Sequence, residues 1–170
     1  MSEASTEKTA TVLGGGSWGT ALASIIAGHG YRTLLWMRDA ELAEVINTTH
    51  RNPRYLGDSE LNPGVEATTD LKYSVASSEI TIVAIPSKHL RSVVHEVGDY
   101  ISGDRIMLSA TKGLEAPGLK RMTEVIAEET CVMKLGALSG PNLAREIVAG
   151  QPAATVVASP FQEVIEKTER

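Results

Sequence analysis

The sequence has a single cysteine, no basic run and no long apolar segment. One cysteine, Cys131, excludes a disulfide framework and a cysteine-rich zinc site. Lysine and arginine number 16 against 21 aspartates and glutamates, so the net charge is −5, and we expect neither a nucleic acid nor an acidic membrane surface as a partner. No stretch approaches the roughly 18 apolar residues of a membrane-spanning helix, so no membrane insertion is expected.

The rest of the composition is typical of one globular domain. The 170 residues are 42% hydrophobic and 22% charged, which is ordinary for a folded chain. We expect a single domain over residues 1–170, in the cytoplasm, with residues 1–8 as a polar tail that lacks the apolar core of a signal sequence. The four histidines show no metal-ligand spacing, so no metal site is predicted.

Short apolar runs alternate with helical periodicity along the chain. This alternation predicts an α/β fold with a doubly wound, mostly parallel sheet (Rossmann-like). A loop is expected over residues 52–64, which are rich in proline, glycine and asparagine. Strands are predicted at residues 9–13, 33–37, 65–68, 79–85, 105–109, 134–138 and 153–158, and helices from Ser17 to about Gly28, around residues 42–46, after Asp70, and at residues 87–100, 119–129, 142–149 and 161–170.

A glycine pattern, Gly14-x-Gly16-x-x-Gly19, lies between the first predicted strand and the first predicted helix. In dinucleotide-binding turns the first glycine permits a tight turn, the second lets the backbone approach the diphosphate, and the third packs the helix on the strand. The dipole and free N–H groups of the helix start then favour the negative charge. The alternative is a glycine-rich turn with a purely structural role.

The same residues also match a second motif, the G-x-S-x-G nucleophile elbow of α/β-hydrolases, with Ser17 as nucleophile. That motif needs an acid and a histidine further along the chain, and His89 or His95 would be the candidates. Its serine normally follows several strands, whereas Ser17 follows the first, so the placement disfavours a hydrolase.

The end of the second predicted strand bears on the choice of nucleotide. An acid about 20 residues after the glycines usually binds the ribose hydroxyls of NAD. Here Arg38 occupies that region, and a guanidinium there suits the 2′-phosphate of NADP. Asp39 would serve the ribose or cap the next helix, and Arg38 alternatively is a solvated loop residue. The residues favour NADP or dual use.

Two further strand ends carry polar groups at the edge where ligands of doubly wound sheets lie. Pro86 and Ser87 follow one strand, with Ser87 a candidate helix N-cap. Lys112 follows the next and suits a phosphate or a developing alkoxide, the alternative being a solvated lysine.

Ser139-Gly140-Pro141-Asn142 opens a predicted helix whose first turn would contain the proline and offer N–H groups to an anion.

Taken together, five segments resemble bacterial NAD(P)-dependent glycerol-3-phosphate dehydrogenase. They are GGGSWGTALA from Gly14, LLWMR from Leu34, IPS from Ile85, ATKGLE from Ala110 and SGPNLAREIVAGQPAATVVAS from Ser139. The resemblance implies reversible hydride transfer between sn-glycerol 3-phosphate and a nicotinamide cofactor, run mainly from dihydroxyacetone phosphate toward glycerophospholipids, by an enzyme that is a homodimer at full length.

The resemblance also implies roles for individual residues. The cofactor would contact Ser17, Trp18, Arg38 and Ala144, with Asp39 adjacent; the substrate would contact Gly140 and Asn142; and Lys112 would contact both. From the glycine motif and from the position after a strand, we also expect Gly14, Gly16, Gly19 and Pro86 to bind the cofactor. Asn142 departs from the serine or threonine expected at its position, although an amide also donates hydrogen bonds.

Length is the larger departure from the family. A second, helical domain of these enzymes supplies the lysine that accepts the proton and most of the groups that hold the substrate phosphate. No segment of this sequence resembles that domain, so we expect a cofactor-binding half with negligible turnover by itself. A non-catalytic nucleotide-binding or redox-sensing module is the alternative, although the TKG and SGP segments favour the enzyme.

Overall fold

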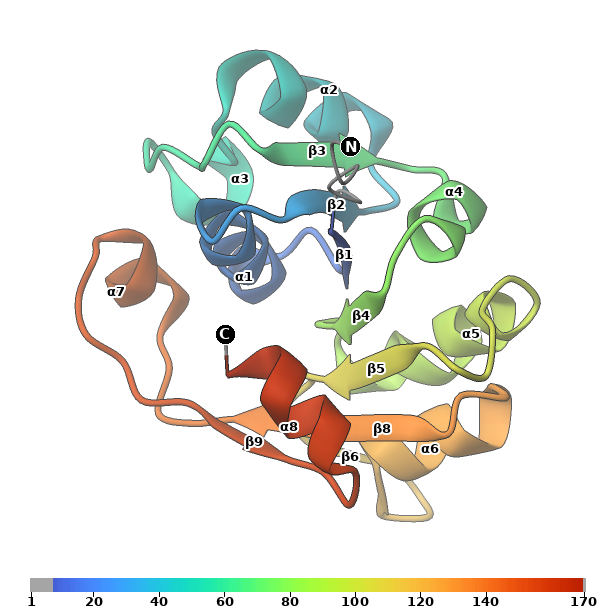
Figure 1. Ribbon diagram of the computed structural model, residues 1–170. Helices are drawn as coiled ribbons and strands as arrows, with labels where there is room; N and C mark the ends of the chain where they lie inside the picture. The colour runs from blue at the N-terminus through green and yellow to red at the C-terminus, as the bar shows by residue number, and fades with distance from the viewer. Residues whose placement is uncertain (1–7, 170) are drawn as a thin grey trace, which may run out of the picture.

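A seven-stranded sheet with helices on both faces forms the centre of the molecule (Figure 1). The computed structural model describes residues 8–169; the tail predicted at residues 1–8 therefore lies, except for Lys8, outside the described residues. In spatial order the strands are β3 (Val65–Thr68), β2 (Arg32–Trp36), β1 (Thr9–Leu13), β4 (Ile80–Val83), β5 (Ile106–Ser109), β8 (Lys134–Ser139) and β9 (Val156–Ala158).

All neighbouring strands of this sheet are parallel except β8 and β9, which pair antiparallel. The order 3-2-1-4-5 followed by one more parallel strand is that of a doubly wound Rossmann sheet, so the predicted fold class is confirmed. The sequence order reverses between β1 and β4, and the carboxyl ends of these two strands are where such sheets form their ligand crevice.

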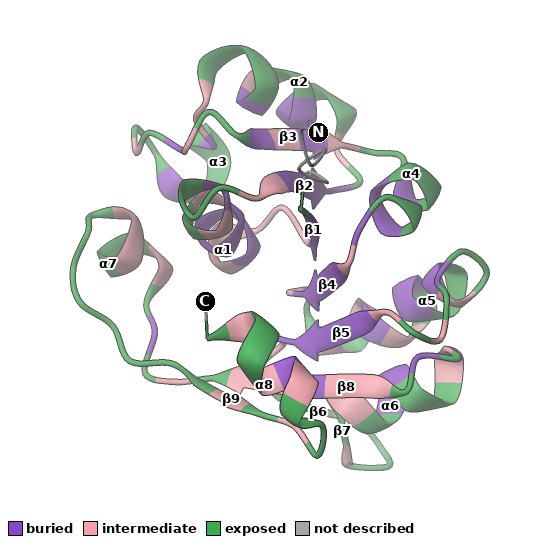
Figure 2. Cartoon of the chain, viewed as in Figure 1, coloured by how far each residue is buried: buried purple, intermediate pink, exposed green. Residues whose placement is uncertain are grey.

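Alternating side chains of the central strands build two separate cores. Val12, Ile82 and Leu108 join one core with the helices α1 (Ser17–Gly28) and α2 (Ala40–Thr49), whereas their neighbours Leu13 and Val83 join another with α4 (Leu71–Ala76), α5 (Ser87–Gly98) and α6 (Met122–Glu129). Successive residues of a strand point to opposite faces, so strands covered on both faces are buried at every residue, as Figure 2 shows for β1, β4 and β5. The other helices are α3 (Pro53–Leu56), α7 (Ala144–Val148) and α8 (Gln162–Thr168).

Two short features differ from the expected loops. Residues 53–56 form α3 inside the segment predicted as a loop, with Pro53 in its first turn, where a missing N–H costs nothing. A two-stranded hairpin, β6 (Leu114–Glu115) with β7 (Lys120–Arg121), follows Lys112 and replaces the start of the helix predicted from residue 119, which begins instead at Met122.

Two predicted helix starts are also corrected. Pro86, not Ser87, is the N-cap of α5, and no side chain caps that helix start. Helix α7 begins at Ala144 with Leu143 as its N-cap, so Pro141 and Asn142 precede the helix and the proline is not in its first turn. Figure 1 shows α7 away from the sheet, within the long connection between β8 and β9. Within residues 8–169, none of the helices is both long and apolar enough to cross a membrane.

Candidate functional site

The first and third glycines of the turn between β1 and α1 are required by packing. Gly14 has φ +124°, and a Cβ there would lie 2.5 Å from the carbonyl oxygen of Ala84 on the neighbouring strand end. A Cβ on Gly19 would lie 1.9 Å from the carbonyl oxygen of Gly14. Any side chain at Gly19 would therefore push α1 away from the strand that precedes it.

Gly16 has no such internal reason to be glycine. Its φ of −75° is open to any residue, and a Cβ there would meet no atom within 4 Å. Gly16 is the N-cap of the 12-residue α1, whose start has neither a side-chain cap nor an acidic residue in the first turn. The space at this helix start, with its unpaired N–H groups, fits a diphosphate that approaches from outside the chain.

A cleft of about 590 Å³ runs along the carboxyl edge of the sheet from the glycine turn. Ten of the twelve residues predicted for the site line it: Gly14, Gly16, Ser17, Trp18, Arg38, Asp39, Pro86, Lys112, Asn142 and Ala144. Gly19 lies behind the turn in the packing described above, and Gly140 lines an adjoining cavity of about 1000 Å³. Trp18, Lys112 and Asn142 line both spaces and therefore mark their junction.

Asp39 is a helix cap and an ion-pair partner. Its Oδ1 accepts a hydrogen bond from the backbone N–H of Leu42 at 2.9 Å, which caps α2, and its Oδ2 pairs with the guanidinium of Arg54. The Leu42 N–H, and after it Arg54, hold the pKa of the Asp39 carboxyl below its usual value. The capping alternative is therefore what the structure has at Asp39, and the exposed Arg38 beside it lines the cleft.

Helix α3 and its N-cap residue contribute three residues that no sequence motif assigns to the site. Arg54 and Tyr55 line the cleft, and the Tyr55 carbonyl accepts a hydrogen bond from the Ser17 hydroxyl at 3.2 Å. Asn52 is fully buried and donates from its amide to the carbonyl oxygen of Gly15 at 3.1 Å and to the hydroxyl of Thr20 at 2.8 Å. Asn52 therefore fixes the glycine turn from behind. The only signal in the sequence was Asn-Pro, which is compatible with a helix start as well as a loop.

Lys112 stands at the other end of the cleft, on the connection that leaves β5. Its Nζ donates to the carbonyl oxygen of Asn142 at 3.4 Å and lies 6.0 Å from the centroid of the Trp18 ring. Just before it, the Thr111 hydroxyl lies within hydrogen-bonding distance of two carbonyl oxygens, that of Ile85 at 2.9 Å and that of Val83 at 3.1 Å. The lysine thus projects from a connection that is bonded to the end of β4, and its ammonium is exposed to the cleft.

Asn142 offers an unpaired acceptor at the same place. Only 4% of its surface is exposed, its amide nitrogen donates to the hydroxyl of Thr155 at 3.0 Å, and its Oδ1 is buried without a partner in the described part of the chain. A buried carbonyl without a hydrogen bond is costly, which suits a donor from a ligand. A Cβ on Gly140 would lie 2.3 Å from the carbonyl oxygen of Ala154, so glycine lets these two connections approach.

A charged network anchors the hairpin that follows Lys112. Nε and Nη2 of Arg91 each donate to the Glu115 carboxylate at 2.7 Å. The same guanidinium pairs with Glu128 and Glu129 on α6. The hydrogen bonds to Arg91 lower the pKa of the Glu115 carboxyl, and hydrogen bonds to Lys120 and then Arg91 lower that of Glu128.

Among residues 8–169, no three His, Cys, Asp or Glu side chains are grouped as a metal site would require.

The strand order and the cleft at its reversal point define a Rossmann-like domain with a glycine-turn site. Residues 9–165 match the family model for the N-terminus of NAD-dependent glycerol-3-phosphate dehydrogenase. The chain belongs to this family.

Curated relatives are longer than this chain. It is 48% identical over 149 residues to the glycerol-3-phosphate dehydrogenase [NAD(P)+] of Acinetobacter baylyi, which spans 88% of this chain and 42% of the relative. The enzyme of the same name from Azotobacter vinelandii is 47% identical, over 87% of this chain and 43% of the relative. The chain therefore spans less than half the length of these relatives, whose names state that they use NAD(P)+.

Solved structures of the family have the same fold. Glycerol-3-phosphate dehydrogenase from Coxiella burnetii superposes with a TM-score of 0.88 at 30% identity, over 95% of this chain and 49% of that one. The enzyme from Saccharomyces cerevisiae gives a TM-score of 0.84 at 29% identity, over 93% of this chain and 49% of that one. In both cases the match extends over about half of the longer protein.

Proposed function

We propose that this chain is the cofactor-binding part of an enzyme that interconverts sn-glycerol 3-phosphate and dihydroxyacetone phosphate with NAD(P)(H). The observation that carries the proposal is the cleft that runs from the glycine turn to Lys112 and Asn142. It provides an anion-binding helix start at one end and an exposed ammonium at the other. The proposal includes a cytoplasmic location, a role in glycerophospholipid synthesis and a homodimeric full-length enzyme.

The glycine end would hold the nucleotide. Gly14 and Gly16 leave the start of α1 open to the diphosphate, Ser17 and Trp18 begin that helix, and Gly19 keeps the helix close to β1. Pro86 and Ala144 would lie along the sides of the cofactor, because both line the cleft. Arg38 would bind the adenosine end, and its positive charge favours NADP or dual use over NAD alone.

The lysine end would hold the substrate. When bound, the nicotinamide cofactor would supply the hydride chemistry that interconverts C2 of glycerol 3-phosphate and the carbonyl carbon of dihydroxyacetone phosphate. The Lys112 ammonium would donate hydrogen bonds to substrate oxygen as negative charge develops there, and Gly140 and Asn142 would border the substrate in the adjoining cavity. The unpaired Oδ1 of Asn142 would accept a hydrogen bond from a ligand, which a serine at this position would also do.

The proton acceptor for the C2 hydroxyl would come from the second domain that the family resemblance implies. We therefore expect the 170-residue chain to bind nucleotide and to turn over negligibly, because general acid–base help alone is commonly worth about 10²–10⁴-fold.

Calorimetric titration of the 170-residue chain with NADPH and with NADH tests the proposal. Binding of NADPH at least as tight as that of NADH is the expected result. Absence of binding by both nucleotides would contradict the assigned cofactor site. A turnover rate close to that of a full-length relative would instead contradict the division of labour between the two domains.

A further inference from the structure

Arg54 lines the same cleft as Arg38, the arginine that we propose binds the adenosine part of the cofactor. It comes from α3, whereas Arg38 follows β2, and the two are brought to one cleft by the fold. Arg54 lines this cleft with a side chain that is 52% exposed. No sequence motif connects it to Arg38.

Asp39 holds Arg54 in this position. Both carboxylate oxygens of Asp39 are already bonded, one to the Leu42 N–H and the other to Nη1 of Arg54. The aspartate is therefore engaged with its own chain, which reduces its use as an acceptor for ribose hydroxyls. A guanidinium carries five N–H donors in a fixed plane. The donors of Arg54 that do not bond Asp39 are therefore left for a ligand.

A phosphate monoester is the ligand chemistry that suits such groups. Guanidinium forks bind phosphate oxygens through parallel hydrogen bonds, which are stronger and more specific than contacts between neutral groups. NADP(H) differs from NAD(H) by one such phosphate, on the 2′ position of the adenosine ribose. A second guanidinium in the cleft that Arg38 lines would therefore favour the nucleotide that carries this phosphate.

Resting on the proposed function, we propose that Arg54 is a second determinant of cofactor choice: it joins Arg38 in binding the 2′-phosphate of NADP(H), and Asp39 positions it for that contact. A purely structural role is the competing explanation, in which the ion pair only attaches α3 to the connection between β2 and α2. The two explanations differ in whether loss of Arg54 depends on the 2′-phosphate of the ligand.

Arg54→Gln is the variant that separates them. Titrate the 170-residue chain with NADPH, NADH, adenosine 2′,5′-bisphosphate and AMP, so that the 2′-phosphate is tested with and without the nicotinamide half. We expect R54Q to weaken binding of the two 2′-phosphorylated ligands by about tenfold or more, as for the loss of a charged hydrogen bond. NADH and AMP should stay within about twofold, which also shows that the variant is folded.

Arg51→Gln is the matched control. Arg51 lies three residues earlier, pairs with Glu60 at 2.5 Å, is 42% exposed and does not line the cleft. R51Q removes the same charge and should leave all four affinities near those of the parent chain. Equal weakening of NADPH binding by R51Q and R54Q would reduce the effect to net charge and overturn the proposal.

The remaining outcomes distinguish this inference from the function on which it rests. If the parent chain binds NADPH and R54Q keeps the same ratio of NADPH to NADH affinity, Arg54 does not determine specificity, while the cofactor site stands. If the parent chain binds none of the four ligands, both the cofactor site and the role of Arg54 are wrong.

Discussion

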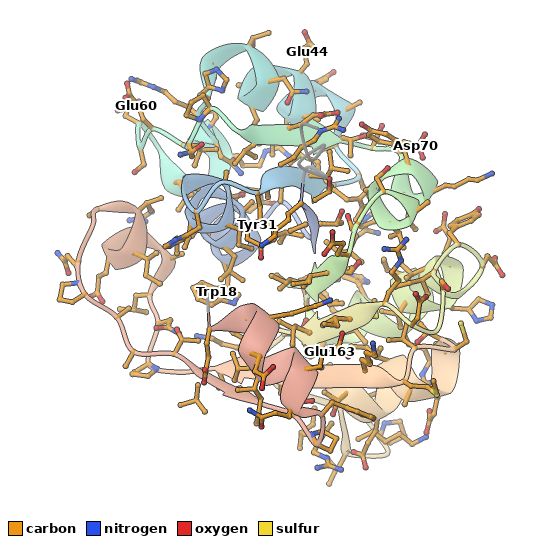
Figure 3. The ribbon with its side chains drawn as sticks, in the orientation of Figure 1. Trp18, Tyr31, Glu44, Glu60, Asp70 and Glu163 are labelled. Carbon is orange, nitrogen blue, oxygen red and sulfur yellow. The ribbon has the colours of Figure 1, made fainter. Side chains whose placement is uncertain are left out.

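The indole N–H of Trp18 donates a hydrogen bond to the carbonyl oxygen of Ala110 at 3.2 Å, which ties the second residue of α1 to the end of β5. Figure 3 shows Trp18 between α1 and α8. Lys112 is two residues beyond Ala110, and its ammonium lies 6.0 Å from the centre of the Trp18 ring. The glycine turn and the lysine connection are therefore held together by one side chain.

Trp18→Phe should weaken both stability and nucleotide binding. Phenylalanine keeps most of the apolar packing but leaves the Ala110 carbonyl without its donor, which costs about 1 kcal/mol in the free energy of unfolding. The Lys112 connection also loses its link to α1, so NADPH affinity should fall. Urea unfolding and calorimetric titration measure the two effects; an unchanged value in both would mean that the hydrogen bond does not organise the cleft.

Gly16→Ala and Gly19→Ala form a matched pair within one turn. At Gly19 the new methyl group meets the Gly14 carbonyl at 1.9 Å, so we expect a loss of about 3 kcal/mol or more in unfolding free energy. At Gly16 the methyl meets nothing within 4 Å, so the cost should stay near 1 kcal/mol or less, that of a poorer N-cap. Thermal unfolding of both variants checks this order.

The same pair separates folding from binding. A methyl group on Gly16 would occupy the space through which the diphosphate approaches the start of α1, so the folded G16A variant should bind NADPH at least about tenfold more weakly. Retention of full affinity would show that the nucleotide does not approach the turn at Gly16.

The sheet could be predicted because the residue types within each strand form a recognisable local pattern. β1, β4 and β5 are buried on both faces, so each is a short, mostly apolar or β-branched run bounded by turn residues, and the glycine spacing marked the turn after β1. Lys112 and Asn142 were assigned by their positions after strands, together with the family resemblance, and the structure brings them within hydrogen-bonding distance.

What could not be predicted depends on contacts between distant segments. The four residues of α3 are too few to show helical periodicity, and the place of Arg54 in the cleft follows from its pairing with Asp39, 15 residues away. The strands of the hairpin after Lys112 have two residues each, and are stabilised by Arg91 on α5. Neither feature has a local signal that distinguishes it from a loop.

The ion-pair network around Arg91 should make the free energy of unfolding depend on pH. Hydrogen bonds to His95 and Arg91 hold the pKa of Glu129 below its usual value, and Arg91 does the same for Glu115. A carboxyl whose pKa is lower in the folded state stabilises that state above its unfolded pKa of about 4.3, and loses the contribution as pH falls through the folded pKa.

Arg91→Met should therefore be less stable than the parent chain at pH 7, and the difference should shrink as the carboxyls become protonated at low pH. Urea unfolding at several pH values between about 3 and 7 measures this convergence. Arg121→Met is the control, because Arg121 forms its ion pair with Glu124, three residues further along the chain, and is 74% exposed. A gap between R91M and the parent that is the same at all pH values would assign the effect to packing and not to the carboxylates.

Lys112→Ala tests whether the cleft belongs to a catalyst or to a module that only binds nucleotide. Because this chain spans 42% of the Acinetobacter baylyi relative, the substitution is best made in a chimera that joins residues 1–170 to the remainder of that enzyme. Loss of an ammonium that stabilises developing charge should lower kcat by about 10²-fold or more. Because the Lys112 side chain is exposed, we expect the variant to stay folded. Lys88→Ala, an exposed lysine on α5 that lines neither cavity, should retain the parent rate. Equal rates for K112A and K88A would remove Lys112 from the reaction and favour a module whose cleft binds the nucleotide without acting on a substrate.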